Sequence, residues 1–274
     1  MSPNKTVAII GAGPVGLAAA AHALERGLTP VVLEAGPRSG HAVRQWSHVR
    51  MFSPWKYNVD STAARLLRSA GWIMPDADRC PTGSEFVAHY LEPLATRTPL
   101  AGHIRTGHKV AAVARAGFDK VKSAGRDKAA FELHFDGQPP ITAAAVIDAS
   151  GTWFTPNPAG ANGLPVPGEA RCGGRIVYGT PDLLGAARVR YAGKTVAVLG
   201  SGHSAIGSLI DLAELARSVP ATRIIWITRG GVPDKAFGSS NDQLAERGAL
   251  GGKVAALLAQ GRIPSRSWTC ISPA

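Results

Sequence analysis

The sequence predicts an α/β fold of two units, each with a doubly wound parallel sheet, the second of them partial. Two observations carry this prediction. A short β-branched run at 6–10 leads directly into a glycine-rich turn and an Ala-rich helical pattern, and the same succession recurs at 194–216. Strands of parallel sheets are short, continuous apolar runs, and the passage from such a strand through a turn into a helix is the repeating element of α/β folds.

The first glycine-rich turn contains Gly11, Gly13, Pro14 and Gly16. In a dinucleotide-binding turn the first glycine permits a tight bend, the second lets the backbone approach a pyrophosphate, and the third allows close packing of helix on strand. Proline suits the first helical position, because its missing N–H leaves no partner unsatisfied. We therefore expect a helix that begins at Pro14 and stops at Gly27.

The second strand of this unit, residues 30–34, ends on Glu34. A carboxylate about 20 residues after the glycines accepts hydrogen bonds from ribose hydroxyls. Strand, turn, helix, strand and acid together predict a Rossmann-like dinucleotide site, and a glycine-rich turn without a ligand is the alternative.

The second turn places Gly200, Gly202 and Ala205 at the three fingerprint positions, with Ser204 at the start of a helix. Alanine is an accepted third residue of this motif. The following strand ends on Arg229, where no acid is present. A cation there fits a 2′-phosphate, which favours NADP over NAD, although a solvent-exposed loop arginine is the alternative.

A third motif lies between the two turns, where an apolar strand at 143–149 ends on Ser150 and Gly151 before a proline-rich stretch. This motif and the two glycine fingerprints together span about residues 5–250. Their order along the chain resembles the flavin-containing monooxygenase-like family of two-dinucleotide-binding flavoproteins. The resemblance implies FAD at Gly11, Gly13, Gly16 and Glu34, and NADPH at Gly200, Gly202, Ser204 and Arg229. It also implies that the backbone of Val110 contacts the adenine.

The family pattern assigns residues 1–185 to an FAD-binding domain, with an antiparallel excursion at about 104–147, and 186–274 to a partial NAD(P)-binding domain. We expect strands at 104–114, 130–135 and 141–149, after a helix at 84–99 that is capped by Ser84 and interrupted near Pro93.

In the resembling family, residues 44–58 run along the flavin. Arg44 is a candidate partner of the pyrophosphate, because guanidinium groups suit phosphate oxygens. Trp46 and Trp55 either flank a flat ring or pack in the core. His41 and His48 fit surface or packing positions better than acid–base roles, and without a carboxylate cluster they do not predict a metal site.

The chain departs from the family in three places. Residues 175–182 lack the histidine motif of the monooxygenases, and nothing after residue 229 supplies the acidic segment that meets the flavin's ribityl chain. The tail at 261–274 lacks strand alternation, so we expect a chain truncated relative to its relatives, with an unrelated tail. Cys80, Cys172 and Cys270 form no Cys-x-x-Cys pair, which disfavours a disulfide reductase.

These observations predict an NADPH-dependent, monooxygenase-like FAD oxidoreductase that acts on a small organic substrate, with no catalytic acid or base identified. The alternatives are a nucleotide-binding remnant without turnover and, less favoured, a flavin-dependent reductase without oxygenation. The net charge of +11 suggests nucleic-acid binding as a further alternative. However, the sequence has no run of Lys and Arg typical of that function. No uninterrupted apolar run reaches membrane-spanning length, and three separated cysteines without a signal peptide predict a cytoplasmic protein.

Overall fold

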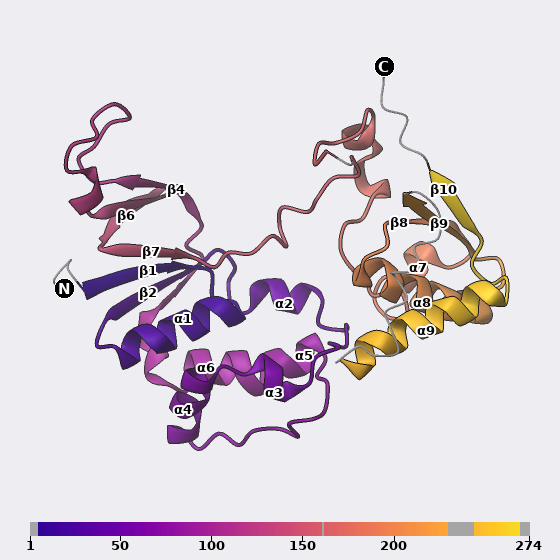
Figure 1. The fold of residues 1–274 in the computed structure, drawn as a ribbon, viewed down its shortest axis with the longest axis horizontal. Helices are drawn as coiled ribbons and strands as arrows, with labels where there is room; N and C mark the ends of the chain where they lie inside the picture. The colour runs from indigo at the N-terminus through magenta and orange to yellow at the C-terminus, as the bar shows by residue number, and fades with distance from the viewer. Residues whose placement is uncertain (1–4, 161, 230–243, 269–274) are drawn as a thin grey trace. The chain divides into compact units, whose positions relative to one another are not determined.

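The computed structural model describes residues 5–160, 162–229 and 244–268 of the 274-residue chain. The chain divides into two compact units, Met1–Thr152 and Trp153–Ala274, and each contains a parallel sheet (Figure 1). The predicted α/β fold is confirmed. The division falls before residue 185, because the connecting segment packs with the second unit: Leu183 is buried in its core, and Arg190 donates to the carbonyl of Gly174.

The parallel sheet of the first unit has the strand order β3-β2-β1-β7. Its strands are β1 (Thr6–Ile10), β2 (Thr29–Glu34), β3 (Ile104–Thr106) and β7 (Ala145–Asp148). Ile10 pairs with Leu33 on one side and with Asp148 on the other. The carboxyl ends of β1, β2 and β7 therefore lie next to one another, at the edge where ligands of such sheets bind.

Short helices cover one face of this sheet. They are α1 (Pro14–Glu25), α2 (His41–Gln45), α3 (Trp55–Asn58), α4 (Ser61–Ser69), α5 (Gly83–Phe86) and α6 (Glu92–Thr96). Val7, Ile9 and Val32 of the sheet share one buried cluster with Leu17 of α1 and Leu67 of α4. Such a continuous apolar contact is the main stabilising feature of a packed domain.

An antiparallel sheet covers the other face. It consists of β4 (Val110–Arg115), β5 (Phe131–Phe135) and β6 (Gln138–Ala143). Leu133 and Phe135 pack against Ala8, Val31 and Leu33. The first unit is thus layered as antiparallel sheet, parallel sheet and helices, rather than with helices on both faces as a doubly wound sheet has.

Two predicted strands each divide in the structure. The segment 104–114 forms β3, in the parallel sheet, and β4, in the antiparallel sheet. The segment 141–149 contributes the end of β6 and the whole of β7 in the same way. In both places the chain passes from one sheet to the other, and a local apolar pattern does not record which sheet a residue joins.

The predicted helix at 84–99 begins earlier and continues through its proline. Thr82, rather than Ser84, is the N-cap: its hydroxyl accepts from the Glu85 N–H at 3.2 Å, and its own N–H donates to the Glu85 carboxylate at 2.7 Å. A π-helical turn, η2 (Val87–Leu91), joins α5 to α6, and Pro93 lies at the start of α6. The wider turn carries the helix past a residue that lacks an N–H. A 3₁₀ turn, η3 (Pro99–His103), follows.

The second unit has a three-stranded parallel sheet in the order β10-β9-β8. Its elements are η5 (Glu169–Arg175), α7 (Arg188–Tyr191), β8 (Thr195–Leu199), α8 (His203–Ser218), β9 (Arg223–Arg229), α9 (Ala245–Ala259) and β10 (Ser265–Trp268). Ile224 and Trp226 of β9 are buried with Leu209 of α8 and Val254 of α9. The prediction of a tail without a strand was wrong, because β10 pairs with β9 in parallel.

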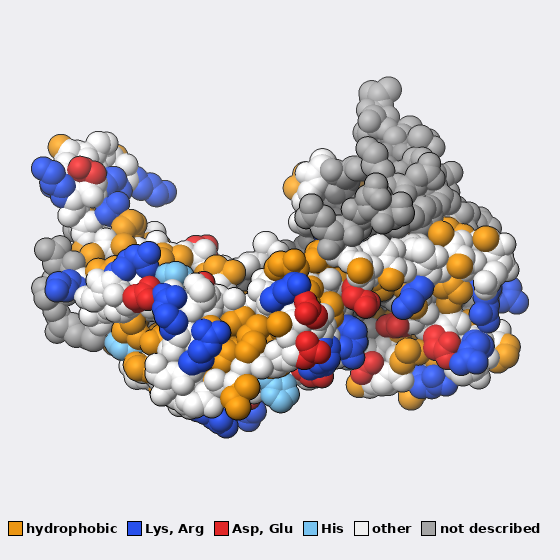
Figure 2. Space-filling view, turned by 60° about the horizontal axis from the view of Figure 1, so that its bottom comes forward, with side chains coloured by type: hydrophobic (Ala, Val, Ile, Leu, Met, Phe, Trp, Pro, Cys, Tyr) orange, Lys and Arg blue, Asp and Glu red, His pale blue; other side chains and the backbone are white. Residues whose placement is uncertain are grey.

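The surface is basic, and its charges are dispersed. Figure 2 shows Lys and Arg side chains spread over the visible face, with Asp and Glu among them. In the part of the chain that the structure describes, no helix combines the length and the apolar character that a bilayer crossing requires.

Candidate functional site

The first glycine turn is shaped by close packing at two of its three glycines. Gly11 has a φ of +99°, and a Cβ there would lie 2.7 Å from the carbonyl oxygen of Ala149. A Cβ at Gly16 would lie 1.9 Å from the carbonyl oxygen of Gly11. Gly13 differs, because nothing lies within 4 Å of the position its Cβ would occupy. The turn therefore leaves room at its middle glycine, where a pyrophosphate approaches.

Gly13 is also the N-cap of α1, without a side-chain cap, and Pro14 is the first helical residue as predicted. The first N–H groups of a helix have no partner within the helix, and the helix dipole favours negative charge there. An anion next to Gly13 would complete these hydrogen bonds.

Glu34 is buried at the end of β2, with 7% of its surface exposed. One carboxylate oxygen accepts from the Ala12 N–H at 2.8 Å, and the other accepts from the Gly36 N–H at 2.8 Å. Each carboxylate oxygen can accept a second hydrogen bond. Glu34 thus ties the glycine turn to the loop after β2 and keeps acceptor capacity for a ribose hydroxyl.

The third motif lies against the first turn. The Ala149 N–H donates to the Ile10 carbonyl at 2.9 Å, and Ser150 donates to the Asp148 carboxylate from both its N–H, at 3.0 Å, and its hydroxyl, at 2.6 Å. The hydroxyl and then the N–H of Ser150 lower the pKa of Asp148. Gly151 has a φ of +67°. The sequence analysis did not single out Asp148, although the Asp-x-Ser spacing is typical of a local Asx turn.

Arg44 and Val110 have other partners in the structure. The Arg44 guanidinium donates to the Ser39 carbonyl and to the Glu92 carboxylate, both at 3.3 Å. Val110 begins β4 opposite Phe135, at a register shift of the antiparallel sheet. Their predicted roles toward pyrophosphate and adenine remain predictions.

The two tryptophans of the same region also differ in their surroundings. Trp55 is fully buried, and its ring centroid lies 5.8 Å from that of Phe86, so it packs in the core. Trp46 is half-buried, and a Cβ at Gly83 would lie 2.7 Å from the Trp46 carbonyl oxygen.

The second glycine turn is open at its glycines. Gly200 has a φ of +112°, donates to the Ile227 carbonyl at 3.0 Å and accepts from the Trp226 indole N–H at 2.7 Å. Gly202 is the N-cap of α8, and no atom of the described residues lies within 4 Å of its Cβ position. Ser204 is exposed in the first turn of α8. Arg229 ends β9, but its side chain lies outside the described residues, as does Cys270.

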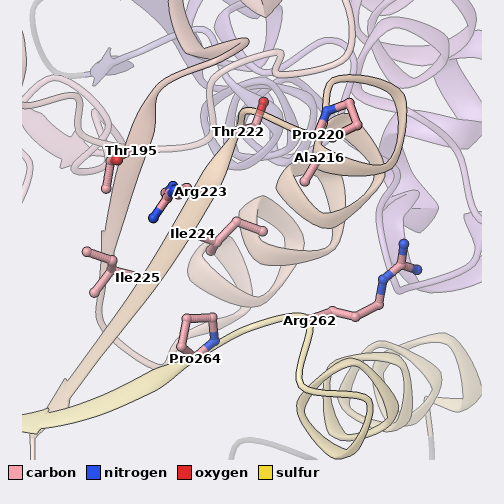
Figure 3. A pocket seen from close by; sticks show the side chains of 9 residues that line it. All are labelled: Thr195, Ala216, Pro220, Thr222, Arg223, Ile224, Ile225, Arg262 and Pro264. Carbon is pink, nitrogen blue, oxygen red and sulfur yellow. The ribbon is translucent and has the colours of Figure 1, made fainter.

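A surface hollow of about 590 Å³ lies in the same unit (Figure 3). Thr195 and Arg223, the first residues of β8 and β9, line it together with Pro220, Arg262 and Pro264. Dinucleotides bind at the carboxyl ends of parallel strands. The hollow is at the amino ends, so it is separate from the predicted site at Gly202.

The model of the pyridine nucleotide-disulphide oxidoreductase family matches residues 8–223, more than half of the chain. The chain belongs to this family. The match covers both glycine turns and the segment between them, and it confirms the predicted resemblance to two-dinucleotide-binding flavoproteins.

A curated relative is the indole-3-pyruvate monooxygenase YUCCA1 of Oryza sativa subsp. japonica, which is 29% identical over 241 residues. The match covers 86% of this chain and 52% of the relative, so the chain spans about half the length of that protein.

Two solved structures show the same fold. The bacillithiol disulfide reductase of Bacillus cereus is 22% identical, with a TM-score of 0.69, over 96% of this chain and 67% of that one. OTEMO, solved in complex with FAD and NADP, is 19% identical, with a TM-score of 0.53, over 85% of this chain and 40% of that one.

Proposed function

We propose that this chain is the dinucleotide-binding part of an NADPH-dependent FAD oxidoreductase of the monooxygenase-like kind, which acts on a small organic substrate. The observation that carries the proposal is the pair of glycine turns, each with an open middle glycine at the start of a helix of at least 12 residues. The family match spans both turns, and the FAD and NADP complex of OTEMO supports the choice of cofactors.

The residues of the first turn fit FAD. The space at Gly13 and the unpaired N–H groups of α1 suit a pyrophosphate, and the buried carboxylate of Glu34 suits a ribose hydroxyl. Ala149 and Ser150 lie against the turn from the β7 side, since a Cβ at Gly11 would lie 2.7 Å from the Ala149 carbonyl oxygen and 3.1 Å from the Ser150 Cα. These groups hold and orient a cofactor; they are not placed to transfer protons.

The second turn fits the phosphates of NADPH in the same manner. The open Gly202 and the exposed start of α8, with Ser204 in its first turn, suit a pyrophosphate, and Arg229 at the end of β9 is the proposed partner of the 2′-phosphate. Bound NADPH and FAD would supply hydride-transfer and oxygen chemistry. The work of this chain is then to bind and orient the two dinucleotides.

A flavin-dependent reductase without oxygenation is the second candidate. Residues 175–182 lack the histidine motif of the monooxygenases, and the Tyr178 hydroxyl of this stretch is engaged by Glu169. A dithiol mechanism has no support in the described residues, where Cys80 and Cys172 belong to different units and form no disulfide.

Absorbance spectroscopy tests the proposal. The purified chain is loaded with FAD, and its spectrum is recorded before and after anaerobic addition of NADPH. Bleaching of a protein-bound flavin band is expected, and transfer of an oxygen atom from O2 into an organic substrate after readmission of air, rather than oxygen uptake alone, then separates the monooxygenase-like function from the reductase. A chain that retains no flavin, or retains flavin that NADPH does not bleach, contradicts the proposal and favours a nucleotide-binding remnant.

A further inference from the structure

The surface hollow of the second unit lies apart from the proposed dinucleotide sites. It is at the amino ends of β8 and β9, whereas the second glycine turn follows the carboxyl end of β8. Its volume of about 590 Å³ is within the usual range of small-molecule sites. The residues that line the hollow therefore indicate which kind of small molecule suits it.

The strands at the hollow bury one face and expose the other. Ile224 and Trp226 of β9 are buried in the cluster that includes α8 and α9. Successive side chains of a strand lie on opposite faces, so Arg223 and Ile225 lie on the other face. Thr195 of β8 pairs in register with Arg223, which places it on that face too. Thr195 and Arg223 are exposed, and Ile225 is half-buried.

The exposed face changes from polar to apolar along the strands. Its first row holds the side chains of Thr195 and Arg223, which lie side by side (Figure 3). The next row holds Ile225, and Pro264 lies beside it, since the Trp226 N–H donates to the Pro264 carbonyl at 3.2 Å. Two strand residues rise about 6.6 Å. A ligand that spans both rows thus meets a cation at one end and apolar carbon at the other.

The positive charge of the hollow is not balanced by an acid within it. Arg223 and Arg262 line the hollow, and none of the described residues that line it is acidic. A hydrogen bond from Arg217 and, less strongly, the charge of Arg262 lower the pKa of Glu214, so Arg262 has an acid nearby. The Arg223 side chain has no hydrogen bond or ion pair with the described residues. A guanidinium in this situation suits a carboxylate, sulfonate or phosphate group.

We propose that the hollow binds a small amphipathic acid, with its anionic group at Arg223 and Thr195 and its apolar body over Ile225 and Pro264. The Thr195 hydroxyl can donate a second hydrogen bond to the same anionic group. A neutral apolar ligand would leave the guanidinium without a partner, and an inorganic anion would leave the apolar row uncovered. The inference does not rest on the proposed function, because the hollow is at the opposite end of the sheet from the second glycine turn.

Fluorescence titration with anilinonaphthalene sulfonate tests the site, because this probe joins a sulfonate to an apolar aromatic body. Arg223→Gln should raise the Kd about tenfold, or roughly 1.4 kcal/mol, since a charge-assisted hydrogen bond is lost, and Arg223→Lys should keep most of the affinity. Ile225→Thr should raise the Kd about fivefold by reducing the apolar contact. Arg171→Gln is the matched control, because it removes an exposed arginine of the same unit outside the hollow and should leave the Kd unchanged.

Displacement of the bound probe tests the two ends of the ligand separately. Decanoate should displace the probe, whereas decanol, which has the same apolar chain without the charge, should displace it much less. Saturating NADP⁺ should leave the probe bound, because the second glycine turn lies at the other end of the strands. Thermal unfolding of Arg223→Gln should match that of the wild type, since this exposed side chain has no partner to lose among the described residues.

Four outcomes would overturn the inference. Equal affinities of Arg223→Gln and Arg171→Gln would show that the probe responds to net charge and not to the hollow. Displacement by NADP⁺ would place the probe at a dinucleotide site. Affinity lost only together with a lower unfolding temperature would reveal a structural effect of Arg223→Gln. A stable dimer in analytical ultracentrifugation that binds no probe would show that a second copy of the chain covers this face.

Discussion

The two glycine turns share a residue pattern, but their glycines are required for different reasons. In the first turn a Cβ at Gly11 would meet the Ala149 carbonyl, and one at Gly16 would meet the Gly11 carbonyl. In the second turn, nothing lies within 4 Å of the Cβ positions of Gly200 and Gly202. The first turn is therefore fixed by its contacts with α1 and with the chain after β7, and the second by its backbone conformation. The open middle glycine is common to both, and we propose it as the ligand-facing position.

The largest expected effect tests whether close packing fixes the first glycine turn. Gly16→Ala should lower the free energy of unfolding of the first unit by about 3 kcal/mol, because its Cβ would collide with backbone 1.9 Å away. Gly207→Ala in α8 is the matched control, since it has nothing within 4 Å and should gain up to about 1 kcal/mol from helix propensity. Urea unfolding measures both. Equal effects of the two substitutions would contradict the contrast between the turns.

A smaller effect is expected at the acid of the first turn. Glu34→Gln leaves one acceptor oxygen for the N–H groups of Ala12 and Gly36, so one of them loses its partner, at a cost of about 1–3 kcal/mol. Glu214→Gln in α8 removes an exposed carboxylate paired with Arg217 and should not change stability measurably. Urea midpoints compare the two variants, and a Glu34→Gln midpoint equal to that of the wild type would show that these two bonds contribute nothing.

Substitutions at the two open glycines should weaken cofactor binding without changing the fold. Gly13→Val should weaken FAD binding and Gly202→Val should weaken NADPH binding, each about tenfold, or roughly 1.4 kcal/mol, because a side chain would fill the space of the phosphates. Each substitution leaves the other site as its internal control. Isothermal titration with each cofactor gives the affinities, and circular dichroism checks the fold. If Gly13→Val binds FAD as the wild type does, the first turn does not hold the pyrophosphate.

The smallest effect concerns the segment that enters the second unit. Hydrogen bonds from the Tyr178 hydroxyl, and then from the N–H groups of Val166 and Ala159, lower the pKa of Glu169 below its usual value of 4.5. A lowered pKa in the folded state stabilises this segment above pH 4.5, and the stabilisation is lost as the pH falls through the lowered value.

Amide hydrogen exchange at Ala159 and Val166, corrected for the intrinsic rate, should therefore accelerate as the pH falls below about 4.5. Glu169→Gln is the control, because it removes the titrating group and should abolish this pH dependence. Protection that stays constant in the wild type down to about pH 3, well below the usual glutamate value, would show that the carboxylate does not hold the segment.

Elements with a local cause could be predicted closely from the sequence. The structure contains three features where the sequence predicted them: the helix that starts at Pro14, its stop near Gly27 and the strand that ends on Glu34. Each depends on a property of a few adjacent residues: the fixed φ of proline, the positive φ of glycine, or an apolar β-branched run. The helix predicted to start at Ser204 likewise appears, as α8, which begins one residue earlier at His203.

Elements decided by distant partners were predicted less well. The cap of α5 is an exception: Thr82 caps it in place of Ser84 because Glu85, three residues on, returns a bond to Thr82, a local capping box that the prediction missed. The strand β10 forms because β9 offers it an edge, which a tail with two prolines did not reveal. Arg44 pairs with Glu92, 48 residues away, a contact that no local spacing indicates.

The sequence by itself determined both glycine turns, the strands that lead into them, Glu34 and the class of ligand that such turns hold. These features depend on backbone conformation, which neighbouring residues dictate. Only the tertiary structure decided that Ala149 lies close to Gly11, that the excursion forms a separate layer, and that a buried nitrogen of His48 has no hydrogen-bond partner among the described residues. These features depend on packing between segments far apart in the chain, where the free energy of contact outweighs local preference.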